Sequence, residues 1–94
     1  MKTDYFLERL TSESEARKAL SELLPGQCDP WILWAGEEDV LAFFDFNAFS
    51  DHPICICASV SGRHYGEDEP VLAVLRQLQQ RIGGVIEDDY GNVL

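Results

Sequence analysis

The chain has 94 residues, of which 46% are apolar and 26% are charged, so it can bury a hydrophobic core as one small globular domain spanning residues 1–94. Seventeen acidic residues against seven basic ones give a net charge of −10. A surface with that bias repels nucleic acid and anionic membranes, and we expect neither as a partner.

The N-terminal segment, residues 4–10, has the apolar spacing of a short helical turn. Tyr5, Phe6 and Leu10 would form its apolar stripe, and Thr3 could cap it. A second helical signal follows and ends at a Pro-Gly pair. Its capping box and apolar positions are Ser12 with Glu15, then Ala16, Ala19, Leu20, Leu23 and Leu24. The pattern predicts one helix broken near residue 11 or two short helices.

From residue 31 the pattern changes to short runs that are rich in aromatic and β-branched side chains. Two such runs, residues 31–35 and 40–46, flank a Gly-Glu-Glu-Asp segment with turn chemistry, which predicts a hairpin. A third strand is expected over residues 54–60 after a polar loop. A fourth strand is expected to begin at Val85.

The strongest helical signal covers residues 70–82. Pro70 suits a first helical position, the acidic residues before it suit the positive end of a helix, and Gly83-Gly84 suits its C-terminal end. The apolar stripe consists of Val71, Leu72, Val74, Leu75, Leu78 and Ile82. The resulting order, α-β-β-β-α-β, predicts an α+β two-layer sandwich: a mostly antiparallel four-stranded sheet with its helices on one face.

Acidity and aromatic side chains both concentrate in the predicted hairpin. Between Lys18 and Arg63 there is no basic residue, yet this stretch holds six of the ten aromatic residues. Side chains alternate across a strand, so Trp31 and Trp34 point to opposite faces and both faces carry bulky apolar groups. Because the helices can cover only one face, we expect the other to be covered by another chain, unless the N-terminal segment wraps around it or the sheet curls.

This reasoning gives a set of candidate partner-binding residues in and beside the hairpin. They are Trp31, Trp34, Glu37, Glu38, Asp39, Phe43 and Asp45. The acidic members would rim an aromatic surface and select a basic partner.

Support in the sequence for a catalytic, metal-binding or small-molecule site is weaker than that for a partner-binding surface. One candidate site for a metal or a small molecule consists of His52, Cys55, Cys57 and His64. Two cysteines at positions i and i+2 of a strand lie about 6.6 Å apart, however, which is too far for both to bind one ion well. We expect buried structural thiols, no metal and no cofactor. The chain also lacks a nucleophile elbow, and the varied polar loop over residues 62–66 has no phosphate-cradling pattern.

The sequence therefore favours a non-catalytic protein-binding domain over an enzyme. Its profile is analogous to that of bacterial immunity proteins, which neutralise basic toxins. The alternatives are the metal or small-molecule site and a structural homodimer. An odd number of cysteines and an N-terminus without an apolar signal run predict a cytoplasmic protein with reduced thiols.

Overall fold

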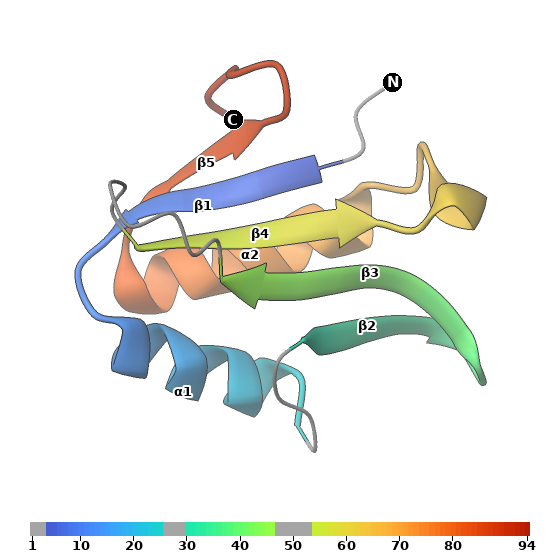
Figure 1. Cartoon of the computed structure of the whole chain (residues 1–94), viewed down its shortest axis with the longest axis horizontal. Helices are drawn as coiled ribbons and strands as arrows, with labels where there is room; N and C mark the ends of the chain where they lie inside the picture. Colours follow the sequence, from blue (N-terminus) through green and yellow to red (C-terminus); the bar gives the residue numbers. More distant parts are fainter. Residues whose placement is uncertain (1–3, 26–29, 47–53) are drawn as a thin grey trace.

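The computed structural model describes residues 4–25, 30–46 and 54–94 (Figure 1). In chain order the elements are β1 (Asp4–Leu10), α1 (Glu13–Leu23), β2 (Trp31–Gly36), β3 (Asp39–Phe46), β4 (Ile54–Val60), the 3-10 turn η1 (Gly62–His64), α2 (Glu69–Ile82) and β5 (Val85–Asp88). No helix within these ranges is both long and apolar enough to cross a membrane.

The strands form one open sheet in the order β2-β3-β4-β1-β5, and every neighbouring pair is antiparallel. Both helices lie on the same face of this sheet (Figure 1). The predicted α+β class, with an antiparallel sheet and helices on one face, is therefore confirmed. The strands β4 and β5 run in the same direction because β1 lies between them and is antiparallel to both.

The first segment is a strand and not a helical turn, so the sheet has five strands where the sequence analysis predicted four. A bulge between Leu7 and Leu10 interrupts the pairing of β1 with β4, and Arg9 within it has a φ of 63°. The bulge returns Leu10 to the core, so that Leu7 and Leu10 are both buried although they are three residues apart. That spacing resembles the apolar stripe of a helix, which explains the wrong prediction.

The helix α1 starts at the predicted cap. The Ser12 hydroxyl accepts a hydrogen bond from the Glu15 backbone N–H at 3.2 Å, and the Arg17 side chain meets the Glu13 carboxylate at 3.2 Å one turn away. The helix is a single segment that follows β1. It buries Ala16, Ala19 and Leu20 against the sheet layer.

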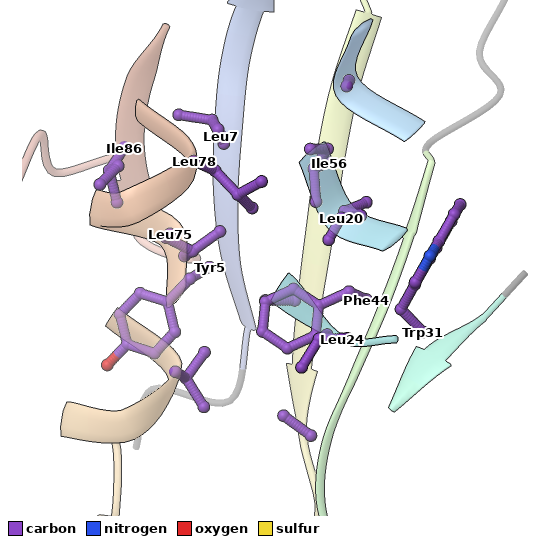
Figure 2. Packing of buried hydrophobic residues seen from close by; sticks show 14 of the residues in the cluster. Tyr5, Leu7, Leu20, Leu24, Trp31, Phe44, Ile56, Leu75, Leu78 and Ile86 are labelled. Atoms are coloured by element: carbon purple, nitrogen blue, oxygen red, sulfur yellow. The ribbon is translucent and has the colours of Figure 1, made fainter. Parts of the chain in front are cut away.

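The hydrophobic core fills the space between the two helices and the inner face of the sheet (Figure 2). Leu75 and Leu78 of α2 are fully buried in the same cluster as Leu7 of β1 and Ile86 of β5. The predicted helix over residues 70–82 is confirmed, and its apolar stripe is what holds α2 on the sheet.

Leu75 should be one of the most sensitive positions for stability, because its side chain is completely buried. We expect Leu75→Ala to lower the free energy of unfolding by about 2–5 kcal/mol, measured by urea denaturation. The control is Gln77→Ala on the exposed side of the same helix, which should change it by less than about 0.5 kcal/mol. Equal shifts in the two variants would contradict the packing of α2.

Candidate protein-binding face

The face of the sheet that points away from the helices is called the open face here. It is defined by cross-strand pairing, because residues directly opposite one another share a face. The described residues assigned to it by this register, or by alternation along a strand for Cys55, are Ile32, Trp34, Val40, Phe43, Asp45, Cys55, Cys57, Ser59, Asp4, Phe6, Glu8, Val85 and Glu87. Polar and apolar side chains are mixed on it.

The two tryptophans lie on opposite faces, as alternation predicts, but only one is available to a partner. Trp31 lies opposite Phe44 on the helix side of the sheet, is 1% exposed, and donates its indole N–H to the Ser21 hydroxyl at 3.2 Å. Its inclusion among the partner-binding candidates is therefore corrected: Trp31 belongs to the core. Trp34 and Phe43, on the open face, are 48% and 39% exposed.

The charged side chains that the strand register assigns to the open face all have the same sign, whereas Arg9, exposed in the bulge of β1, is not paired in the register. The acidic residues are Asp4, Glu8, Asp45 and Glu87. The two helices together hold four acidic and four basic residues, so the helix layer is neutral. The whole net charge of −10 therefore comes from strands, loops and termini.

The hairpin turn adds two exposed carboxylates to this surface. Glu37 and Glu38 form the turn between β2 and β3, and both are exposed as predicted. Glu38 has a φ of 57°, in the left-handed region that such tight turns require. The end of the hairpin extends past α1 in Figure 1, so the helix layer does not cover it.

Asp39, at the start of β3, takes part in a contact within the chain, and its side chain remains 28% exposed. Its Oδ1 lies 3.0 Å from His64 Nε2 and 3.4 Å from Arg63 Nη1. His64 Nδ1 contacts the Glu67 carboxylate, and the His64 side chain is only 12% exposed. This group, Asp39-His64-Glu67, ties the start of β3 to the loop before α2, and we call it the histidine clamp.

The clamp favours the doubly protonated imidazole, because each ring nitrogen then donates to a carboxylate. The hydrogen bonds to Asp39 and Glu67 raise the pKa of His64 above its ordinary value. Reciprocally, the hydrogen bond from His64 lowers the pKa of Asp39. Asp39 and His64 are 25 residues apart in the sequence, so the loop composition alone could not indicate this contact.

The pH dependence of stability should report the clamp. A raised pKa in the folded state means that the contribution of His64 is fully present below its unfolded pKa of about 6.5 and is lost as the pH rises through the folded value. Since Asp39 has a lowered pKa in the folded state, its contribution to stability is lost as the pH falls through this folded pKa. The clamp should therefore stabilise the fold most between about pH 4 and about pH 6.5.

An NMR titration of the His64 ring tests this directly. We expect Asp39→Asn to lower the His64 pKa because it removes the largest cause of the shift. Glu37→Gln is the matched control: it removes the same charge from the turn beside Asp39 and should leave the His64 pKa nearly unchanged. Equal effects of both variants would show that general surface charge, and not the clamp, sets this pKa.

The two strand cysteines share the open face but do not form a reactive pair. Burial raises the pKa of Cys55 to about 12, with Glu8 and Glu87 adding to the effect, and burial also raises the pKa of Cys57. Both thiols are therefore protonated near neutral pH and are poor nucleophiles. Cys55 is buried, as predicted, whereas Cys57 is only half-buried.

The residues of the alternative metal or small-molecule site are dispersed as far as the structure describes them. His64 lies beyond the C-terminal end of β4, whereas Cys55 is near its start, about 17 Å from Val60 by strand length. Both nitrogens of His64 already face carboxylates. His52 lies outside the described residues. Among those that are described, no group of three or more potential metal ligands occurs.

Comparisons of the chain with protein-family models, with curated proteins and with solved structures found no match. The functional argument therefore depends on the open face itself.

Proposed function

We propose that this protein is a non-catalytic binding domain whose open face takes a basic protein partner. One observation supports the proposal above all. The open face combines two exposed aromatic rings, Trp34 and Phe43, with charged residues that are all acidic among those that the strand register assigns to it. Aromatic anchors surrounded by charge of one sign are typical of a surface that recognises a partner of the opposite sign.

The two components would contribute differently to binding. Burial of the two rings removes apolar surface from water and would supply much of the affinity. The acidic residues would speed the encounter with a basic protein and disfavour acidic ones, and this effect weakens as salt is added. A partner whose surface is both basic and partly apolar fits both components.

A second copy of the same chain fits the surface less well than a basic protein does. A homodimer through the open face would bring together two surfaces on which the charges assigned by the strand register are all acidic. Like charges across an interface are unfavourable unless they are paired. We therefore place the basic partner before the structural homodimer. A stoichiometric neutraliser of a basic protein, analogous to an immunity protein, would act in this way.

Site-specific photocrosslinking tests the proposal in cells of the source organism. A photoreactive residue would replace Phe43 on the open face, and in the control protein it would replace Gln77, which is exposed on α2. We expect position 43, but not position 77, to crosslink a protein with an isoelectric point above about 9. Crosslinking of the same proteins from both positions, or of an acidic partner from position 43, would contradict the proposal.

Binding of the purified pair would then test the charge argument. Glu87→Gln on β5 should weaken binding about 2- to 5-fold at low salt, since an exposed charge pair contributes about 0.2–1 kcal/mol. Glu15→Gln on α1, which removes the same charge from the helix layer, should have no effect. Binding that is insensitive to salt and to Glu87→Gln would refute the electrostatic part of the proposal.

A further inference from the structure

We infer that the histidine clamp acts as a proton-operated latch on the loop of residues 62–67, called the η1 loop here. While His64 is protonated, the clamp holds this loop on the start of β3. When His64 loses its proton, the loop opens and the rest of the fold stays closed. Three features support this latch: how the loop is attached, how many donors the imidazole ring has, and what is fixed on either side of the loop.

The η1 loop is attached to the rest of the fold mainly through one carboxylate. Among the described residues, its polar contacts with another element all go to Asp39, from His64 Nε2 at 3.0 Å and from Arg63 Nη1 at 3.4 Å. Its backbone bonds are local: the His64 N–H donates to the Ser61 carbonyl oxygen at 2.8 Å, and the Glu67 N–H donates to the His64 carbonyl oxygen at 2.9 Å. No residue of the loop is buried, so the clamp is its principal tether.

The clamp needs both protons of the imidazole ring. The ring of His64 lies between two carboxylates, with Asp39 at Nε2 and Glu67 at Nδ1. A neutral imidazole has only one N–H, so its other nitrogen would direct a lone pair at a carboxylate oxygen. That contact is repulsive, and loss of the proton therefore opens the clamp on one side.

The balance of charge around His64 changes with the same proton. The charged groups of this cluster are Asp39 from β3, Arg63 from η1 and Glu67 from the segment before α2. With His64 protonated, two cations balance the two carboxylates, and without this proton one negative charge is unbalanced. The two carboxylates raise the pKa of His64 above its ordinary value of 6.5, so the latch opens above that pH.

Fixed contacts on both sides of the loop keep the opening local. Before the loop, the Ser61 N–H donates to the Leu41 carbonyl oxygen at 2.8 Å, beside the paired strands β3 and β4. After the loop, the buried Tyr5 hydroxyl donates to the Asp68 carboxylate. Burial and the contact with Asp68 raise the pKa of Tyr5 above its ordinary value, so this bond persists while His64 titrates.

Amide hydrogen exchange, measured by NMR, tests the latch on the protein alone. Protection factors, which correct for the intrinsic pH dependence of exchange, would be compared about one pH unit below and above the His64 pKa. We expect the protection of the Glu67 amide to fall about 2- to 5-fold at the higher pH, because exposed charge contacts are modest in strength. The amides of Ser61 and Leu72, the latter bonded to the Asp68 carbonyl oxygen at 2.9 Å, should keep their protection.

Three variants assign the effect to the clamp. His64→Ala removes the titrating ring, so the Glu67 amide should be weakly protected at both pH values and lose its pH dependence. Glu67→Gln removes one carboxylate of the clamp and should reduce the pH dependence. The matched control is Glu69→Gln, which removes the same charge from the exposed first residue of α2 and should preserve the pH dependence.

Equal protection of the wild-type Glu67 amide at both pH values would overturn the latch, and so would a pH dependence that survives in His64→Ala. An equal loss of protection at Leu72 would show that the whole fold loosens, which also contradicts a local latch. If the NMR spectrum shows that His64→Ala is unfolded, Glu67→Gln decides the question, because its full retention of the pH dependence would exclude the clamp as the cause.

Discussion

The strand β1 is the element on which the rest of the structure depends, because it is paired along both edges. It joins β5 to the β2-β3-β4 meander, and without it the sheet would separate into two parts. It also fixes α2: the buried Tyr5 hydroxyl donates to the Asp68 carboxylate just before that helix. At the other end of α2, a Cβ on Gly84 would lie 2.7 Å from the Glu8 carbonyl oxygen, so only glycine permits this approach to β1.

The position of β1 makes the sheet wide, and its width produces the open face. Two helices of 11 and 14 residues cover one side of five strands, and both lie on that side. Within residues 4–25, 30–46 and 54–94, no second layer covers the side chains that alternate away from the helices. The charge is also unevenly distributed, because the helix layer is neutral and the acidic excess lies in the strands, loops and termini. The proposed binding function is a consequence of this asymmetry.

Local signals predicted most of the fold from the sequence. Capping residues and an apolar stripe defined α1 and α2, and turn chemistry between aromatic runs defined the hairpin. The exception was β1, where the bulge at Arg9 placed Leu7 and Leu10 on one face and imitated helical spacing. Pattern alone could not distinguish a bulged strand from a helical turn of seven residues.

The candidate site was also predicted only in part, because local pattern does not encode tertiary packing. Alternation along β2 placed Trp31 and Trp34 on opposite faces of the sheet. Which of these faces the helices cover depends on tertiary packing, and in the structure they cover the face that carries Trp31. The acidic turn was predicted correctly as an exposed feature at Glu37 and Glu38. The histidine clamp joins Asp39 to His64, a contact between residues distant in the sequence that no local pattern encodes.

The central claim is that the helices cover one face of the sheet and leave the other open, and the two indole N–H groups report on it directly. A soluble paramagnetic relaxation agent would be added while their NMR signals are recorded, with Trp34→Phe used to assign them. The account predicts strong broadening of the Trp34 signal and protection of the Trp31 signal, whose N–H is hydrogen-bonded to Ser21. Equal broadening of both signals, or equal protection of both, would contradict a one-sided sheet.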